Sequence, residues 1–274
     1  MPVAAQQPEP LVRNKILSQM DQRARNSIHD LAVYRELAST SDHLRQQEFQ
    51  VDRANVCLAE AQTAGRGRRG REWLSAPNRN LMLSISWAFE TWPKTLTGLG
   101  LAVALVVVER LRSSLAVEAQ IKWPNDILVN DAKLAGILVD VAGQHGQQCD
   151  VVIGLGLNIH QPDWEQHATE YAWQDLYSLG VHPQRNLLAA QLIGDCVIML
   201  QEFAVSGFAP MARRWNELSS YQGRTVKISS PNIQVGTLSG VMRGVDEFGA
   251  LLVEDDQSIC HRFVETDISV RVQQ

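Results

Sequence analysis

The chain has 274 residues, of which 45% are hydrophobic and 20% are charged, and its formal net charge is -5 at pH 7. This composition is typical of a globular protein with a sizeable core, and it excludes a chain that is disordered throughout. The acidic balance also argues against a domain that coats nucleic acid, because such a domain would carry an excess of Lys and Arg.

The N-terminal segment, the longest apolar run and the cysteines indicate in which compartment the protein acts. The opening segment has no apolar stretch behind its charges, so it does not resemble a secretory signal. The longest uncharged apolar run, residues 95–108, is shorter than the ~20 residues of a membrane span. The cysteines form no Cys-x-x-Cys pair and have no metal-ligand spacing to a histidine: Cys57, Cys149, Cys196 and Cys260. Isolated thiols fit a reducing compartment, so we expect a cytoplasmic protein without a membrane partner.

The first half of the chain predicts alternating strands and helices. Residues 1–12 are rich in Pro, Gln and Ala, and we expect them to be disordered. The elements expected next are a helix capped by Ser39, Thr40, Ser41 or Asp42 and containing Leu44 and Phe49, a strand at 56–59, a strand with strict alternation at 81–87, and a buried helix at 99–111.

The second half begins with a predicted hairpin, in which residues 127–129 and 137–139 flank the turn Asn130-Asp131-Ala132. A strand at 151–157, broken by Gly154 and Gly156, and helices at 187–203 and 209–218 follow. This order predicts a mixed sheet covered by helices, in the α/β (α+β) class. From Tyr221 onward, short strand-like runs predict a small all-β barrel or sandwich: 226–228, 236–241, 250–253 and 268–272. We therefore expect a larger domain at 13–219 and a smaller one at 220–274.

The stretch AGRGRRGREW, residues 64–73, places four arginines and three glycines between Gly65 and Arg71. Glycines let a backbone approach a ligand closely, and guanidinium groups match phosphate or carboxylate oxygens. A solvated loop without a ligand is the alternative interpretation. The position between two predicted strands favours an anion-binding loop over an RNA-binding tail. We also expect residues 65–71 to be mobile without a ligand, since four like charges would lack a partner.

Two further polar clusters follow in the sequence. The first is Lys122-Trp123-Pro124-Asn125-Asp126 with Lys133-Leu134-Ala135-Gly136, where Pro124 interrupts strand pairing and leaves polar groups at an edge. An ordinary surface hairpin with charge pairing is the alternative for this cluster. The second is residues 154–159, in which two glycines predict close approach either of a ligand or of another strand. The seven histidines have no ligand spacing, so no zinc site is predicted.

Taken in order, five blocks of sequence resemble biotin-protein ligases. They are Ser39-Thr40-Ser41, residues 62–70, residues 122–126, residues 133–137 and Gly156-Leu157-Asn158, and the resemblance extends from about residue 14 to the C-terminus. It implies a mixed-sheet catalytic domain of the class II tRNA-synthetase-like fold and a C-terminal SH3-like β-barrel. The implied reaction joins biotin to ATP as biotinoyl-5'-AMP and then transfers the biotinoyl group to a lysine of the biotin carboxyl carrier protein of acetyl-CoA carboxylase or a related carboxylase.

The resemblance also implies a role for each matching residue. Arg66, Arg68 and Lys133 would be catalytic. Biotin would contact Ser39, Thr40, Ser41, Gln62, Arg66, Gly67, Arg68, Lys133 and Gly136. ATP would contact Arg68, Arg69, Trp73, Asn125, Asp126 and Asn158, and Asp126 would also bind Mg²⁺.

The chain departs from the family pattern in two places. Ser41 stands where the family commonly has asparagine, a difference that concerns one hydrogen bond of the pocket. Only 38 residues precede Ser39, and most of them match the entry segment of the core, so we expect no DNA-binding domain. The oligomeric state implied is a monomer or a homodimer. The alternatives are a lipoate or other acyl-carrier ligase of related fold, and a nucleic-acid-binding repressor, which the acidic balance disfavours.

Overall fold

The computed structural model describes residues 8–74, 77–93, 96–161, 172–229, 237–264 and 268–272. In chain order, its elements are α1 (Arg13–Gln19), α2 (Gln22–Asn26), β1 (Ile28–Tyr34), α3 (Thr40–Arg45), β2 (Ala54–Ala59), a 3-10 turn (Arg68–Gly70), β3 (Leu81–Phe89), α4 (Leu99–Leu115), β4 (Gln120–Lys122), β5 (Asp126–Val129), β6 (Ala132–His145), β7 (Gln148–Leu157), α5 (Arg185–Ser206), α6 (Ala209–Glu217), β8 (Thr225–Ser229), β9 (Thr237–Val245), β10 (Leu251–Glu254), β11 (Cys260–Phe263) and β12 (Ser269–Val272).

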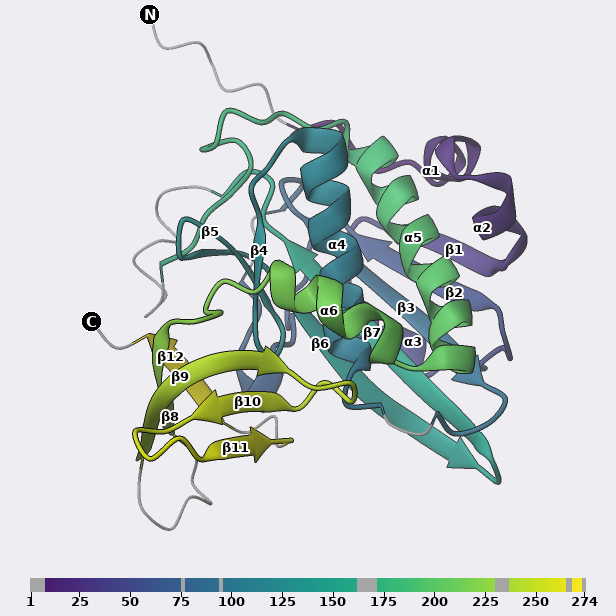
Figure 1. Ribbon diagram of the computed structural model, residues 1–274. Helices are drawn as coiled ribbons and strands as arrows, with labels where there is room; N and C mark the ends of the chain where they lie inside the picture. Colours follow the sequence, from purple (N-terminus) through teal and green to yellow (C-terminus); the bar gives the residue numbers. More distant parts are fainter. Residues whose placement is uncertain are drawn as a thin grey trace, which may run out of the picture.

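A seven-stranded sheet forms the centre of the molecule, in the order β1-β2-β3-β7-β6-β5-β4 (Figure 1). The β1–β2 pair is parallel and the other neighbours are antiparallel, so the predicted mixed sheet is confirmed. The β5–β6 hairpin turns at Asn130 and Asp131, which both have positive φ, as a tight two-residue turn requires.

The two faces of this sheet are covered differently. Helices α4 and α5 lie across one face (Figure 1), where Val56 and Leu58 of β2 join the main hydrophobic core. The side chain between them, Cys57, packs instead with Leu44 of α3. Because successive side chains of a strand point to opposite faces, α3 lies on the other face. The hydroxyls of that helix therefore face the same side of the sheet as the even-numbered residues of β3.

Helix α5 is a core helix despite its apolar composition. By length and composition it could cross a membrane, but 61% of its most apolar window is buried inside the fold. It also holds the N-terminal segment in place, because Arg185, in its first turn, donates to the carbonyl oxygen of Glu9 and to the carboxylate of Glu60. Leu11 is buried as well. Residues 8–12 are thus part of the fold, which corrects the expectation that 1–12 would be disordered; residues 1–7 lie outside the described residues.

A second sheet has five antiparallel strands in the order β11-β10-β9-β8-β12. It packs directly against the larger sheet: the indole Nε1 of Trp123 donates to the carbonyl oxygen of Gly249 at 3.1 Å. A Cβ on Gly249 would lie 2.9 Å from the Cα of Gly98, at the start of α4. The smaller sheet therefore holds the turn between β4 and β5 against the larger body.

Several expected elements need correction. The helix that begins after its Ser39 cap ends at Arg45, so Phe49 lies beyond it. Strand β7 continues unbroken through Gly154 and Gly156, because glycine can maintain ladder pairing. Strands β1 and β11 were not predicted, since neither has regular alternation of apolar residues. All four cysteines are unpaired, and burial raises the pKa of the Cys57 thiol to about 12.

The contact between Trp123 and the smaller sheet gives a testable prediction. Trp123→Phe removes the indole N–H and leaves the Gly249 carbonyl without this donor. It should therefore lower the free energy of unfolding by about 1 kcal/mol more than a Trp→Phe substitution at a buried site where the indole makes no hydrogen bond. The matched variant is Trp87→Phe, because Trp87 is equally buried and its Nε1 makes no hydrogen bond to any described residue. Urea denaturation of both proteins measures the difference, and equal losses would contradict the role assigned to this bond.

Candidate functional site

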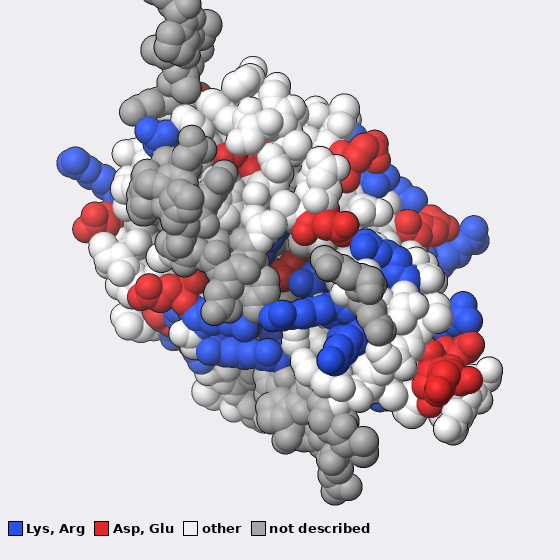
Figure 2. Space-filling view, turned by 90° about the vertical axis from the view of Figure 1, so that its left-hand side faces the viewer, with Lys and Arg blue, Asp and Glu red and all other residues white. Residues whose placement is uncertain are grey.

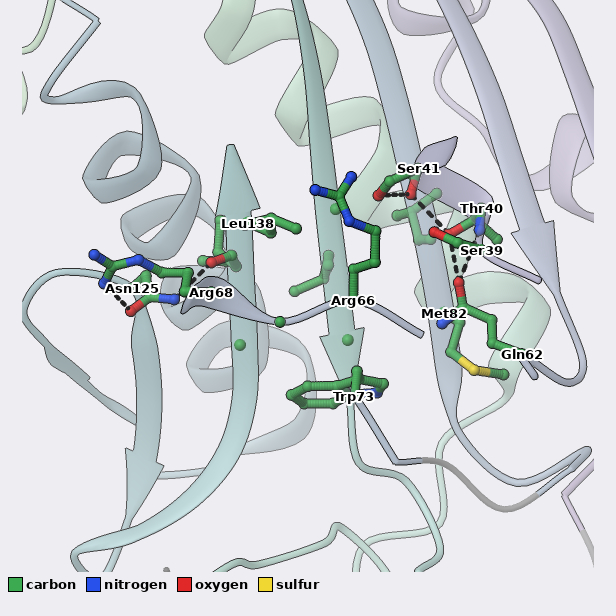
Figure 3. Close-up of a pocket in the computed structure, with 18 of the residues that line it drawn as sticks. Ser39, Thr40, Ser41, Gln62, Arg66, Arg68, Trp73, Met82, Asn125 and Leu138 are labelled. Carbon is green, nitrogen blue, oxygen red and sulfur yellow. Dashed lines mark hydrogen bonds between the residues drawn. The ribbon is translucent and has the colours of Figure 1, made fainter. Parts of the chain in front are cut away.

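A pocket opens on the α3 face of the larger sheet (Figure 3). It lies between α3, strands β3, β6 and β7, and residues 64–73, which we call the arginine loop. All nine residues expected to contact biotin line it, and so do Trp73 and Asn125. Residues that the sequence analysis did not assign complete the lining: Met82, Leu83, Ser84, Ile137, Leu138, Gly154, Leu155 and Gly156. The separate sequence blocks therefore meet in one place.

The floor of the pocket is a strip of the sheet in which three glycines carry no side chain. In the β6–β7 register, Gly136 lies opposite Gly156 and Leu138 lies opposite Gly154. The indole of Trp73 covers this strip, and a Cβ on Gly156 would lie only 2.3 Å from its Cε2 atom. A Cβ on Gly154 would lie 2.9 Å from the Oγ of Ser41. The groups that approach these glycines closely are the side chains of Trp73 and Ser41, and they do so within the pocket; approach of a ligand stays a prediction.

One end of the pocket carries a chain of hydroxyl groups (Figure 3). The Oε1 atom of Gln62 accepts hydrogen bonds from the backbone N–H and the Oγ1 hydroxyl of Thr40, at 2.8 and 3.1 Å. The Oγ of Ser84 lies 2.8 Å from Thr40 Oγ1 and 2.9 Å from Ser41 Oγ. Because Oε1 can only accept, Thr40 donates to it, Ser84 donates to Thr40, and Ser41 donates to Ser84.

This order of donors and acceptors leaves two kinds of hydrogen-bonding group at the end of the pocket formed by Thr40, Ser41, Ser84 and Gln62, the hydroxyl end. The hydroxyl oxygens retain lone pairs that can accept N–H groups of a ligand, and the Nε2 group of Gln62 is a donor. A small ring that carries both N–H and C=O groups would satisfy both. Ser84 was missed in the sequence, although its place in the alternating run of β3 put it on the polar face.

Helix α3 positions these hydroxyls at its first turn. The side chain of Ser39 caps the helix by accepting from the backbone N–H of Asp42 at 3.3 Å. Ser39, Thr40 and Ser41 are all buried, so their polar groups need partners inside the protein or from a ligand. The cap thus fixes both the start of the helix and one wall of the pocket.

The arginine loop lies over the pocket and is tied to three elements. The Nη1 of Arg66 lies 2.8 Å from a carboxylate oxygen of Asp42 and 3.0 Å from one of Asp140. Arg68 points the other way (Figure 3), and its Nη1 donates to Asn125 Oδ1 at 2.8 Å. Arg66 therefore has two carboxylate partners within the protein, and the expected mobility of residues 65–71 stays a prediction.

Lys133 supplies a second cation at the strip of glycines. Its Nζ lies 2.6 Å from the Oδ1 of Asp126 and 5.4 Å from the centre of the Trp73 ring. Asn125 is held by a hydrogen bond from its Nδ2 to the carbonyl oxygen of Ile137 at 2.7 Å. The β4–β5 hairpin therefore positions both Lys133 and Arg68 through two adjacent residues.

Three expected ATP contacts do not line this pocket. Asn158 is buried, and its Nδ2 donates to the backbone carbonyls of Lys133 and Gln174. It therefore holds the backbone at the start of β6. Arg69 is exposed in the 3-10 turn, with a positive φ of 59°. Asp126 lies beside the pocket but has Lys133 as its partner. Among the described residues, no group of three or more His, Cys, Asp or Glu side chains could hold a metal ion.

Charge on the surface is distributed unevenly. Figure 2 views the molecule from the side of β4, β5 and β12, and it shows Lys and Arg side chains gathered in a band with Asp and Glu on either side. The whole chain is nevertheless acidic, with a formal charge of -5. A local excess of cations attracts anionic ligands without making the protein basic as a whole.

Comparison with known proteins agrees with this geometry. The chain is 37% identical over 267 residues to the bifunctional ligase/repressor BirA of Escherichia coli, a match that covers 96% of this chain and 80% of that protein. The chain belongs to the biotin protein ligase family. A model of the biotin/lipoate A/B protein ligase family matches residues 33–158. The biotin–[acetyl-CoA-carboxylase] ligase of Mycobacterium tuberculosis is 33% identical over 204 residues, or 73% of each chain.

Solved structures of biotin protein ligases have the same fold. The Aquifex aeolicus enzyme in complex with biotin and ATP matches with a TM-score of 0.76 at 23% identity, over 90% of this chain and 100% of that chain. The Leishmania major enzyme in complex with biotinyl-5-AMP matches with a TM-score of 0.53 at 20% identity, over 86% and 98% of the two chains. These likenesses confirm the fold of the biotin protein ligases for this chain.

The close packing of Trp73 on Gly156 gives a prediction for the pocket floor. Gly156→Ala places a methyl group where the indole lies, so Trp73 must move and become more accessible to iodide quenching of its fluorescence. Gly100→Ala is the matched control, because its Cβ would meet Val139 at an ordinary 3.7 Å. Subtracting the signal of a Trp73→Phe protein isolates the indole. Unchanged quenching of Trp73 in Gly156→Ala would contradict the described packing.

Proposed function

We propose that this protein is an ATP-dependent biotin protein ligase that forms biotinoyl-5'-AMP and transfers the biotinoyl group to one lysine of a carrier protein. The observation that carries the proposal is the presence, in one pocket, of a hydroxyl end and a cationic end, with a floor in which Gly136, Gly154 and Gly156 carry no side chain. Biotin has a matching form: a ureido ring with two N–H groups and one C=O group, an apolar body, and a carboxylate at the far end.

The hydroxyl end suits the ureido ring in both donor and acceptor character. Ring N–H groups donate to the lone pairs of the Thr40, Ser41 and Ser84 chain, and the Nε2 of Gln62 donates to the ring carbonyl. A buried polar ring must be satisfied in this way or lose affinity. Lipoate has a disulfide ring with neither N–H nor C=O, so the same groups would be left without partners. This argues against the lipoate ligase alternative.

The cationic end suits the first chemical step. A carboxylate oxygen of biotin attacks the α-phosphorus of ATP and forms a new O–P bond. The bond from the α-phosphorus to the bridging oxygen breaks, and pyrophosphate leaves. Two anions approach one another, so positive groups must offset the charge that accumulates in the transition state. Lys133 and Arg68 supply it, held by Asp126 and Asn125. The indole of Trp73 walls the same end and excludes water from the acyl-phosphate.

In the second step, the amine of the carrier lysine attacks the acyl carbon. An amide bond forms, AMP leaves, and the lysine nitrogen loses a proton. The partner is a protein such as the biotin carboxyl carrier protein of acetyl-CoA carboxylase, and the net negative charge gives no support for DNA as a partner. We also propose that Asn158 and Arg69 contribute to nucleotide binding from outside the pocket, the former by supporting the backbone of Lys133.

Magnesium enters the proposal as a companion of ATP. Mg²⁺ in nucleotide enzymes keeps several waters and is held by one or two carboxylates together with substrate phosphates. Asp126 is the one carboxylate suggested by the sequence, and its salt bridge to Lys133 argues that positioning this lysine is its main role. Bound Mg²⁺ would neutralise phosphate charge on the leaving pyrophosphate.

The proposal also covers the domain boundaries, the cellular compartment and the oligomeric state. We place the catalytic domain at 13–219 and a C-terminal unit at 220–274, in which the five-stranded antiparallel sheet would be an SH3-like barrel. The reaction belongs in the cytoplasm, where ATP and carboxylases are found, and it needs no more than a monomer or homodimer. The smaller sheet supports the site through the Trp123 contact with Gly249.

The deciding experiment follows the mass of a carrier domain. The carrier should gain one biotinoyl group only when the enzyme, biotin, ATP and Mg²⁺ are all present, and lipoate should not replace biotin. A carrier that stays unmodified, although a known ligase modifies it, would overturn the proposal.

Lys133→Gln should slow adenylate formation by about 10²–10³-fold, the typical cost of losing one preorganised group that stabilises transition-state charge. Biotin affinity should change less, because the ureido end is untouched. Pyrophosphate release measures the first effect and calorimetry the second. Lys15→Gln is the control, since Lys15 lies on α1, away from the pocket. A fall in biotin affinity as large as the fall in rate would contradict the assigned role.

Arg68→Gly should release the adenylate about ten- to a hundredfold faster, as expected for the loss of a charge-assisted contact of ~1.5–3 kcal/mol. The intermediate acylates exposed lysines, so bystander proteins should become biotinylated at many sites. The competing possibility is that Arg68 only screens charge during adenylate formation, in which case labelling of bystanders falls together with the rate. Adenylate release and bystander labelling, measured side by side, distinguish the two.

A further inference from the structure

A buried ion pair joins the first turn of α5 to the residue that follows β2. The Nη2 atom of Arg185 lies 2.7 Å from the Oε2 atom of Glu60, and the two side chains are only 0% and 8% exposed. The other carboxylate oxygen of Glu60 accepts a hydrogen bond from the backbone N–H of Leu11. Arg185 also donates to the backbone carbonyl oxygens of Glu9 and Asn80, at 2.7 and 2.6 Å. Neither member of the pair lines the pocket.

This ion pair lies at the base of the connection between β2 and β3. Glu60 directly follows β2, and Asn80 directly precedes β3. Arg185 bonds to both of these residues, one through its side chain and the other through its backbone. The backbone carbonyl of Glu60 also accepts from the N–H of Asn78 at 2.8 Å. One side chain from α5 therefore holds the two ends of the connection next to each other.

We propose that Glu60 and Arg185 are positioning residues for Gln62, a member of the hydroxyl end of the pocket. Gln62 lies two residues after Glu60, and its Oε1 accepts from the backbone N–H and the hydroxyl of Thr40 (Figure 3). A shift of the base would move Gln62 away from Thr40 and from a ligand that accepts from its Nε2. The consequence for biotin rests on the proposed function, whereas the position of Gln62 does not.

The energetics of this ion pair favour a role in positioning over one in stability. Moving two charges out of water carries a desolvation penalty that their attraction often fails to repay. The Nε atom of Arg185 is also buried and has no hydrogen-bond partner among the described residues, which adds to this penalty. An apolar contact would avoid both penalties, but it has no directional bonds. The planar guanidinium group fixes three acceptors at once, namely Glu60 Oε2, Glu9 O and Asn80 O.

Two backbone amides report whether the segment that carries Gln62 is held. The carbonyl oxygen of Ala61 accepts from the N–H of Leu37 at 3.1 Å, and the N–H of Thr63 donates to the carbonyl oxygen of Leu37 at 3.0 Å. These bonds lie directly before and after Gln62 in the sequence. Their exchange rates therefore respond to a movement of this residue.

Hydrogen exchange of the Leu37 and Thr63 amides tests the position of Gln62. Glu60→Gln keeps the shape of the side chain but replaces one carboxylate oxygen by an N–H donor, so one bond at the base is lost. The two amides should then exchange about tenfold faster, as expected for the loss of a hydrogen bond to a charged group. Exchange at the wild-type rate in Glu60→Gln would overturn the proposal.

Two further proteins separate this effect from a general loss of charge or of folding. Asp195→Asn is the matched control, because it makes the same kind of change in a second ion pair of α5, in which Asp195 lies 2.6 Å from Arg110. Its exchange should equal that of the wild type. Glu60→Gln combined with Arg185→Met has no unbalanced charge, so it replaces Glu60→Gln if that variant fails to fold. Wild-type exchange in the folded double variant would also overturn the proposal.

Calorimetric titration of biotin tests the effect on the pocket. Glu60→Gln should bind biotin about tenfold more weakly. The rate of adenylate formation at saturating biotin should stay at the wild-type level, because Lys133 is held by Asp126 and not by this pair. A loss of rate without a loss of affinity would overturn the assigned role. Failure of the wild type to bind biotin would instead overturn the proposed function, and the exchange rates would still decide whether the pair positions Gln62.

A double-mutant cycle shows whether the effect on biotin passes through Gln62. Gln62→Ala removes the side chain that the pair positions, so adding Glu60→Gln to it should weaken biotin binding no further. Calorimetry of the single and double variants measures this coupling. Additive losses of affinity would show that the pair acts on the pocket by another route, and they would overturn the proposal.

Discussion

The site depends on the register that sets Gly136 of β6 opposite Gly156 of β7. Two facing glycines, followed by Gly154 opposite Leu138, create a strip where a flat group can lie directly on the backbone. A slip of one residue would turn neighbouring side chains of β6 or β7 onto this face and fill the strip. The tight turn at Asn130 and Asp131 helps to fix where β6 begins, and it also brings Lys133 to the edge of the strip.

Each cation around this strip has a polar partner in the protein itself. Arg66 has Asp42 and Asp140, Lys133 has Asp126, and Arg68 has Asn125. In a chain with a formal charge of -5, these partners keep a dense group of positive charges in place before the anions arrive.

The sequence predicted the residues of the site better than their interactions. The glycine–arginine loop and the Lys133 hairpin were identified because glycine, arginine and proline signal special backbone and charge locally. The partners of these residues lie far along the chain: Asp140 follows Arg66 by 74 positions, and Ser84 lies 43 positions from Ser41. Pairings of this kind depend on strand order and on which face carries α3, and neither follows from local pattern. For the same reason, residues 8–12 were expected to be disordered although the buried Arg185 holds them.

The central claim is that the ureido ring of biotin lies at the hydroxyl chain of Ser41, next to Gly154. Calorimetric titration of biotin alone into the wild type and into Gly154→Val tests this most directly, with thermal unfolding as a check that the variant is folded. A side chain at this position would meet the Ser41 hydroxyl, since even a Cβ lies 2.9 Å from it. We expect folded Gly154→Val protein to bind biotin at least a hundredfold more weakly. Wild-type affinity in a folded variant would contradict this account of the site.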